Sequence, residues 1–333
     1  MSKWHDVNGI RIFHGDVLDG LRDMDDKSVH CCVTSPPYFG LRDYGHEDQI
    51  GLEDTPDEFV AKLVEVFREV RRVLRDDGTL WLNIGDSYAN NGSGGQGATG
   101  GRDKSTLASP MPPVGSTPVN KKVPNGLKAK DLIGIPWMLA FALRADGWYL
   151  RQDIIWSKPN PMPESVTDRC TKSHEYIFLL SKSPRYYFDH EAIKDPAVKG
   201  PQRMQASKEA VRAKGAGPMA RGEEGFNHQF ADPDRVWGTD GLRNKRDVWT
   251  VGTKPFKGAH FATFNPELIA PCILAGCPVG GTVLDPFMGS GTTAITAYEL
   301  GRNAVGCELN GEYLHDICLP RIQKHTKQQR LIA

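Results

Sequence analysis

The architecture of this chain can be predicted from the stretch Val29-His30-Cys31-Cys32-Val33-Thr34-Ser35-Pro36-Pro37-Tyr38. Its apolar first half, Val29–Val33, is typical of a buried strand. Two consecutive prolines cannot donate to a sheet ladder, so the strand must end before them. The turn that follows presents backbone carbonyls, the Ser35 hydroxyl and the Tyr38 ring at the carboxyl end of a strand. In open α/β sheets this edge is where ligands bind.

Such a corner suits a flat molecule that carries an NH2 group. The amine can donate to Ser35 Oγ and to the Pro36 carbonyl while the Tyr38 ring stacks on the plane of the molecule. The other interpretation is a proline-terminated strand followed by a surface tyrosine. The stretch by itself leaves both interpretations open.

Upstream, Ile10–Phe13 predicts a short strand that ends in His14-Gly15-Asp16. This places the Asp16 carboxylate at the carboxyl end of a second strand, although Asp16 could equally begin a turn. A short helical segment then leads into the strand that precedes Ser35. The order of these elements already indicates an α/β protein.

Downstream, Thr55-Pro56-Asp57-Glu58 is a strong helix start, with an N-cap, a proline at the first helical position and a capping box. The helix has apolar residues on one face, and Gly78 is expected to end it. Thr79–Ile84 is the next predicted strand, with Gly85-Asp86 again on the ligand-binding edge. The alternation of strand, helix and strand predicts a parallel sheet.

Two regions depart from this alternation. Residues 87–130 are rich in Gly, Ser, Pro and Asn with a basic bias. They predict a mobile basic loop that is either simply solvated or in contact with a phosphate backbone. From Lys182 to Arg221 the hydrophobic pattern fades and basic residues outnumber acidic ones, as on nucleic-acid contact surfaces, with a solvated insertion as the alternative. We therefore expect one domain formed by residues 1–189 and 251–333, and a separate region at 190–250.

Composition excludes several classes of protein. The chain has 333 residues, 39% of them hydrophobic, which suffices for a sizeable core. Its formal net charge is zero, so nucleic-acid binding must come from local clusters of Lys and Arg. The seven cysteines contain no CxxC pair and the ten histidines show no metal-ligand spacing, so no metal is predicted. Without a signal peptide or an apolar run long enough for a membrane, we expect a cytoplasmic protein.

The second informative stretch is Asp285-Pro286-Phe287-Met288-Gly289-Ser290-Gly291-Thr292-Thr293-Ala294. It lies between a predicted strand, Thr282–Leu284, and a helix, and its glycines allow a tight turn and a close approach to a ligand. The next predicted strand is Asn303–Cys307. Glu308 at its end can accept hydrogen bonds from both hydroxyls of a ribose.

This loop also fits the dinucleotide fingerprint, because its glycines are followed by an acid about 20 residues later. Two features favour S-adenosylmethionine over a nicotinamide cofactor. A dinucleotide fold normally begins with this unit, whereas here the unit comes last. In addition, Asp285 would attract the amino acid end of S-adenosylmethionine and repel a pyrophosphate. The loop therefore favours methyl transfer.

Together, the two stretches make the chain resemble the beta-class DNA amino-methyltransferases, whose catalytic motif precedes the target-recognition region and the cofactor loop. Thr34–Tyr38 matches the catalytic motif and Asp285–Thr293 the cofactor motif. His260–Phe264 is similar to the lead-in at the methionine end of the cofactor, and Ile155–Lys158 to the segment beside the target-base pocket. The resemblance covers most of residues 10–318. Where the family usually has a proline, this chain has Asn265.

The resemblance implies a Rossmann-like, mostly parallel sheet flanked by helices, which is the class I methyltransferase fold in circularly permuted order, with an irregular target-recognition insertion at 190–250. The residues that it implies for catalysis are Ser35, Pro36, Pro37 and Tyr38. The cofactor site that it implies consists of Asp16, Thr34, His260, Phe261, Asp285, Pro286, Phe287, Gly289, Gly291, Thr292, Thr293 and Glu308. Within that site Glu308 would hold the ribose and Asp16 would lie near the adenine.

The resemblance also indicates a substrate. Family members with Ser in the first catalytic position mostly methylate cytosine N4, and those with Asp mostly adenine N6. Ser35 therefore implies methyl transfer from S-adenosylmethionine to N4 of a cytosine flipped out of double-stranded DNA, with adenine N6 as the alternative. A non-catalytic DNA-binding module and an RNA or protein amide methyltransferase are remoter alternatives. The sequence leaves open whether a cognate restriction endonuclease is a partner, and whether the chain is a monomer or a homodimer.

Overall fold

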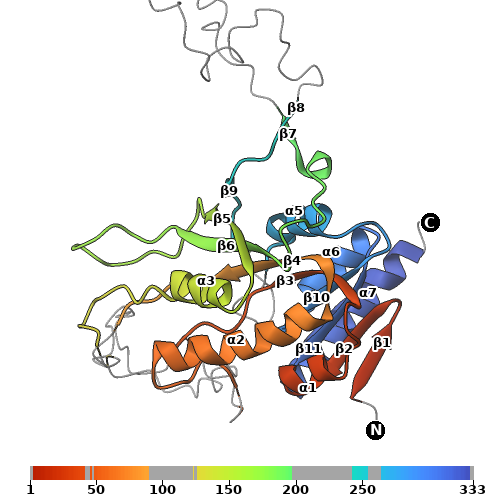
Figure 1. Ribbon diagram of the computed structural model, residues 1–333, viewed down its shortest axis with the longest axis horizontal. Helices are drawn as coiled ribbons and strands as arrows, with labels where there is room; N and C mark the ends of the chain where they lie inside the picture. Colours follow the sequence, from red (N-terminus) through yellow and green to blue (C-terminus); the bar gives the residue numbers. More distant parts are fainter. Residues whose placement is uncertain are drawn as a thin grey trace, which may run out of the picture. The chain divides into compact units, whose positions relative to one another are not determined.

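The computed structural model describes residues 3–41, 46, 49–89, 123, 126–196, 242–253 and 264–330 (Figure 1). The chain divides into two units, residues 1–189 with 246–333, which we call the sheet unit, and residues 190–245, which we call the small unit. In the small unit the described residues form a 3-10 helix, η1 (Glu191–Ile193), and an antiparallel pair, β7 (Asp195–Pro196) and β8 (Leu242–Arg243). Most of the predicted basic loop at 87–130 and of the predicted target-recognition region lies outside the described residues.

The described strands of the sheet unit form one sheet in the order β1-β2-β11-β10-β3-β4-β6-β5-β9. Parallel pairing joins β2 to β11, β11 to β10, β10 to β3, β3 to β4 and β5 to β9, whereas β1 and β6 pair antiparallel to their neighbours. The predicted mostly parallel sheet is confirmed. The strands are β1 (Trp4–Val7), β2 (Ile10–His14), β3 (Val29–Thr34), β4 (Leu74–Ile84), β5 (Tyr149–Ser157), β6 (His174–Ser181), β9 (Val248–Thr250), β10 (Thr282–Asp285) and β11 (Asn303–Glu308).

Helices cover both faces of the sheet (Figure 1). One face carries α1 (Val17–Arg22), α2 (Pro56–Val73) and α3 (Ile135–Ala145). The other face carries α5 (Pro266–Gly276), α6 (Thr292–Glu299) and α7 (Leu319–Arg330), and α7 is preceded by a π-helical stretch, η4 (Tyr313–Cys318). Among the described helices, none combines the length and the apolar character that crossing a membrane requires.

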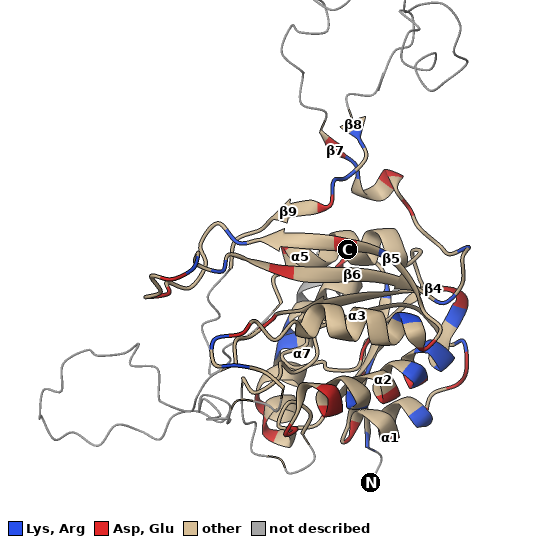
Figure 2. Ribbon diagram, turned by 60° about the vertical axis from the view of Figure 1, so that its left-hand side comes forward, with Lys and Arg blue, Asp and Glu red and all other residues tan. Residues whose placement is uncertain are grey.

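Helix α2 begins as its sequence predicts. Thr55 Oγ1 accepts a hydrogen bond from the Glu58 N–H at 3.2 Å, and the Glu58 carboxylate accepts one from the Thr55 N–H at 3.1 Å, which completes the capping box. Its buried face packs into the core below the sheet, while charged residues of both signs lie along the helix (Figure 2). This amphipathic helix supports the strands that end at the ligand-binding edge.

The predicted end of this helix at Gly78 is wrong. The helix ends at Val73, and Leu74 already adopts extended backbone angles, with φ −69° and ψ 140°. Leu74 pairs with Val29 across β3 and β4, and its side chain is fully buried. Tertiary pairing therefore takes residues 74–78, which the local pattern assigned to the helix and its end, into the first part of β4.

The parallel strands bring several predicted groups to one edge. Asp285 and Glu308 are the last residues of β10 and β11. Asp16 and Ser35 follow the ends of β2 and β3 within two residues. Because these four strands are parallel neighbours, their carboxyl ends lie together. The sheet thus brings the strand-end groups of the candidate site together.

Candidate functional site

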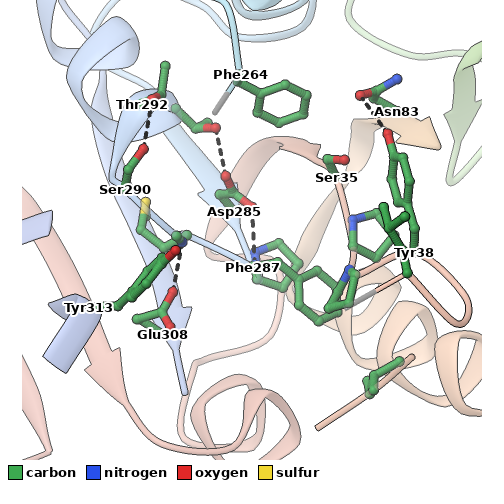
Figure 3. A pocket seen from close by; sticks show the side chains of 18 of the residues that line it. Ser35, Tyr38, Asn83, Phe264, Asp285, Phe287, Ser290, Thr292, Glu308 and Tyr313 are labelled. Atoms are coloured by element: carbon green, nitrogen blue, oxygen red, sulfur yellow. Dashed lines mark hydrogen bonds between the residues drawn. The ribbon is translucent and has the colours of Figure 1, made fainter. Parts of the chain in front are cut away.

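A cavity of about 730 Å³ opens at this edge of the sheet. It is lined by the proline corner after β3 and by the glycine turn after β10, which the sequence separates widely. In Figure 3, Ser35 and Tyr38 lie on one side of the cavity and Glu308 and Tyr313 on the other, with Asp285 and Phe287 between them. The volume is within the range of about 300–1,000 Å³ that is usual for small-molecule sites.

Asp285 joins the two stretches. Its carboxylate accepts hydrogen bonds from Thr34 Oγ1 at 2.7 Å, from Thr293 Oγ1 at 2.6 Å and from the Phe287 N–H at 3.1 Å. Burial raises the pKa of Asp285 to about 6, although these three hydrogen bonds act in the opposite direction. The carboxylate is therefore an ionised, precisely oriented acceptor at neutral pH, and a cationic group in the cavity would lower its pKa.

Glu308 occupies the equivalent place at the end of β11. One carboxylate oxygen accepts a hydrogen bond from the Gly289 N–H at 2.8 Å and the other from the Asn310 N–H at 2.9 Å. Gly289 has φ 52°, in the left-handed region that favours glycine, so the turn needs this residue type there. Burial raises the pKa of Glu308 to about 7. A polyhydroxyl ligand would offer hydrogen-bond donors to this carboxylate.

Asp16 serves two purposes. It lines the cavity, and its carboxylate also accepts hydrogen bonds from the Leu18 N–H at 2.9 Å and the Asp19 N–H at 3.3 Å as the N-cap of α1. Both interpretations that the sequence left open for this residue are therefore compatible with its position. The cap fixes the Asp16 carboxylate, which lines the cavity together with Gly15.

The other end of the cavity contains a polar network around Tyr38. The Tyr38 hydroxyl donates to Glu175 Oε2 at 2.8 Å, and Glu175 forms an ion pair with Lys158. Asn83 Nδ2 donates to the same Glu175 oxygen at 3.3 Å and to the Tyr176 carbonyl at 3.0 Å. Exclusion of water and then the Glu175 carboxylate hold the pKa of the Tyr38 hydroxyl well above its usual value, so the hydroxyl remains a donor. The network fixes the plane of the Tyr38 ring.

Asp86, predicted on the same edge, has a structural role. Its carboxylate accepts hydrogen bonds from the Gly134 N–H at 3.0 Å and the Ile135 N–H at 3.1 Å, at the start of α3. Asp86 is not among the residues that line the cavity. A carboxylate after a strand can therefore cap the next described helix instead of facing the ligand edge.

The structure places the other predicted site residues as follows. Thr34 is fully buried behind the cavity and acts through Asp285, and Gly291 is the N-cap of α6 with φ 79°. His260 and Phe261 lie outside the described residues. The predicted residues that line the cavity are Asp16, Ser35, Pro36, Pro37, Tyr38, Asp285, Pro286, Phe287, Gly289, Thr292, Thr293 and Glu308.

Several lining residues were not among the predicted site residues. Lys158 belongs to the segment that the resemblance places beside the target-base pocket, and Phe264 to the lead-in at the methionine end. Asn83 and Glu175 lie within strands whose apolar pattern predicts only burial. Asn310 and Tyr313 also line the cavity; they follow Glu308 closely and could have been found by extending the ligand edge beyond β11. The other polar or aromatic lining residues outside the prediction are His46, Gln49, Trp156, Asn160, Thr253, Asn265 and Ser290.

Comparison with known proteins adds independent information. A sequence profile of the N6/N4 family, described as DNA methylase, matches residues 29–318. The type II methyltransferase M.Cfr9I of Citrobacter freundii is 48% identical over 318 residues, which are 96% of this chain and 89% of that protein. The type II methyltransferase M.SmaI of Serratia marcescens is 46% identical over 307 residues, which are 92% of this chain and 89% of that protein.

Solved structures share the fold. The cytosine-N4-specific PvuII DNA methyltransferase aligns with a TM-score of 0.58 and 15% identity, over 97% of this chain and 93% of that one. A DNA modification methylase of Thermus thermophilus, in complex with S-adenosyl-L-methionine, aligns with a TM-score of 0.53 and 22% identity, over 95% of this chain and 94% of that one. At these identities the likeness is one of fold.

Proposed function

Since this chain belongs to the N6/N4 family of DNA methylases, we propose that the atom it methylates is the exocyclic N4 of a cytosine in duplex DNA. The chain is a DNA methyltransferase, and S-adenosylmethionine is its methyl donor. The observation that carries the choice of N4 is Ser35, which occupies the first position of the catalytic corner and lines the cavity.

The polar and aromatic groups that line the cavity fit the cofactor. A positively charged amino group suits the buried Asp285 carboxylate, and the two hydroxyls of a ribose suit the Glu308 carboxylate. Phe264, Phe287 and Tyr313 provide aromatic surface around these two acids (Figure 3). Asp16 also lines the cavity and would lie near the adenine. We assign these roles to the residues named. When bound, S-adenosylmethionine supplies a methyl group that its sulfonium makes electrophilic.

The residues around Ser35 prepare the acceptor. Ser35 Oγ and the Pro36 carbonyl would accept the two protons of the cytosine amino group, which draws the nitrogen lone pair out of conjugation with the ring. Tyr38 would stack on the flipped base, and the hydrogen bond from its hydroxyl to Glu175 keeps the ring in one orientation. Holding both reactants in line would supply much of the acceleration. An aspartate at position 35 would instead offer a stronger, charged acceptor for an amine.

Recognition of the DNA sequence is assigned to the 190–250 region. The small unit, residues 190–245, is a separate unit of the chain, and its described part includes the basic residues Lys194, Arg243 and Lys245. Basic side chains on this unit could contact DNA phosphates, although Lys194 and Lys245 are paired with Glu191 and Asp195 in this structure. This assignment is part of the proposal.

The experiment is to identify the methylated base. The protein is incubated with unmethylated genomic DNA and isotopically labelled S-adenosylmethionine, and the DNA is then digested to nucleosides and separated by mass spectrometry. The expected product is labelled N4-methylcytosine, and Ser35→Ala should reduce its rate of formation while the affinity for S-adenosylmethionine stays near normal. Labelled N6-methyladenine as the sole product would refute the choice of N4. A parallel reaction contains RNA in place of the DNA. Label in the RNA but not in the duplex DNA would refute duplex DNA as the substrate.

A further inference from the structure

Three histidines gather on one face of the β1–β2 hairpin, apart from the residues that line the cavity. His5 of β1, His14 of β2 and His315 of η4 each present a ring nitrogen, and these atoms all lie within 4.8 Å of one another. The ring centres of His5 and His315 are 5.3 Å apart and those of His14 and His315 are 5.8 Å apart, both pairs edge to face. Within the described part of the chain, no hydrogen bond or ion pair involves these ring nitrogens.

We propose that His5, His14 and His315 bind a divalent transition metal ion of the zinc type. Imidazole nitrogen is a preferred ligand of zinc, nickel and copper. In a tetrahedral zinc site the ligand nitrogens are about 3.3 Å apart, so small rotations of the three side chains would complete the geometry. Water would occupy the fourth position. His5 and His14 are half-buried and His315 is exposed, which gives a metal ion access from solvent.

The backbone explains why these rings converge. His5 pairs with Ile12 in the antiparallel register of β1 and β2, and His14 lies two residues beyond Ile12, so both side chains point to the same face. Gly311 then allows the chain that leads into η4 to pass against this face. A Cβ at position 311 would lie 2.9 Å from His14 Nε2, so only a glycine leaves the ring its present place.

Lys3 is the nearby positive charge that could oppose a cation. Its ammonium lies 5.4 Å from the centre of the Phe13 ring and 3.9 Å from the Asp19 carboxylate. Phe13 pairs with Trp4 and lies on the face of the hairpin opposite His5 and His14. The ammonium thus lies beside Phe13 and is paired with a carboxylate, although its charge still acts on His14.

The proposed site is independent of methyl transfer, but it adjoins the cofactor side of the fold. Glu308 pairs with His14 in the register of β11 and β2, and His315 follows Tyr313, which lines the cavity, by two residues. A bound metal ion would therefore tie the β1–β2 hairpin to the segment that carries these cavity residues. We expect it to stabilise this part of the protein against unfolding.

The test uses the full chain after treatment with a chelator. Zinc(II) is titrated by calorimetry, and cobalt(II) is titrated by visible absorption, since tetrahedral cobalt has intense bands. Loss of an outer partner of a metal ligand already costs about 10–100-fold in affinity, so His5→Ala and His315→Ala should each weaken binding at least that much. His325→Ala is the matched control, because this histidine lies on α7 and pairs with Glu299 at 3.0 Å.

The expected result is one equivalent of metal bound per chain, a higher melting temperature with zinc, and wild-type binding in His325→Ala. Binding weaker than millimolar in the wild-type chain would overturn the proposal. Wild-type affinity in His315→Ala would also overturn it. The His315 side chain is exposed, so this variant is expected to fold like the wild-type protein. Cys170 is an exposed thiol, so binding that Cys170→Ser abolishes would assign the metal elsewhere and refute the three-histidine site.

Discussion

Lys158 and Glu175 form an ion pair at the end of the cavity that also contains Ser35. Lys158 directly follows β5 and Glu175 lies in β6, the antiparallel neighbour of β5. Their side chains are only 18% and 15% exposed, and the Lys158 ammonium also lies 4.3 Å from the centre of the Trp156 ring. Glu175 accepts a hydrogen bond from the Tyr38 hydroxyl. The ion pair therefore indirectly positions the Tyr38 ring, which we propose stacks on the target base.

Lys158→Met should therefore impair turnover. The change leaves the Glu175 carboxylate without its cation in a partly buried place and loosens the acceptor for Tyr38. A misplacement of about 1 Å can cost roughly a hundredfold in rate, and we expect a loss in kcat of about 10–100-fold with little change in the Kd for S-adenosylmethionine. Steady-state kinetics and calorimetry measure the two quantities.

The control for this change is Lys27→Met. Lys27 pairs with Asp76 at 2.7 Å on the surface, with its side chain 58% exposed, so the change should leave kcat unaltered. If Lys158→Met were as active as Lys27→Met, the ion pair would have no part in positioning Tyr38.

Glu308→Gln should weaken binding of the cofactor. Glutamine keeps the size of the side chain but has one acceptor oxygen in place of two, so it cannot serve the ribose hydroxyls and the Gly289 N–H together. Hydrogen bonds to charged groups contribute about 1.5–3 kcal/mol, so the Kd for S-adenosylmethionine should rise roughly tenfold or more. Glu312→Gln, a change of another acid in the same segment, is the control. An unchanged Kd in Glu308→Gln would remove Glu308 from the cofactor site.

The affinity for S-adenosylmethionine should depend on pH. The pKa of Asp285 is about 6 and that of Glu308 about 7 in the free protein, so both carboxylates lose their charge as the pH falls through these values. Only the ionised Asp285 attracts the cofactor's ammonium group. The Kd should therefore be roughly constant above about pH 8 and rise below about pH 7, by up to about tenfold per pH unit for each of the two carboxylates that must be ionised.

Calorimetric titrations between about pH 5 and about pH 8 measure this dependence. Asp285→Asn should bind more weakly at the upper end of this range and show a shallower rise of Kd toward the lower end, because only Glu308 then titrates within it. A Kd that does not change with pH in the wild-type protein would contradict the placement of the amino group beside Asp285.

Gly276→Ala should lower the free energy of unfolding. A Cβ at the last residue of α5 would lie 2.6 Å from Trp81 Nε1, 2.7 Å from Thr79 Oγ1 and 2.8 Å from Cys31 Sγ. All three neighbours are buried in the sheet and cannot move aside, so the expected cost is about 1–3 kcal/mol by urea unfolding. Gly252→Ala, where the nearest atom is 3.4 Å away, should be close to neutral. Equal stability of the two variants would show that α5 can shift from the sheet.

Local sequence was sufficient for the elements that carry most of the site. The prolines at 36 and 37 end β3, the capping box at Thr55 starts α2, and Gly289 allows the turn before α6. Each of these restricts the backbone within a few residues, so its effect does not depend on the rest of the fold. Parallel neighbours then place the strand ends on one edge, as strand–helix alternation predicts.

Long-range pairing decided the rest. Leu74 lies in β4 and not in α2 because it pairs with Val29 of β3. The Asp86 carboxylate accepts hydrogen bonds at the start of α3 and does not line the cavity. Asn83 and Glu175 reach the site only through the register of β4 with β6, and His315 meets His14 only through the packing of η4 on the hairpin. Such contacts join residues far apart in the chain, and neither periodicity nor spacing carries a signal for them, because they depend on which strands become neighbours.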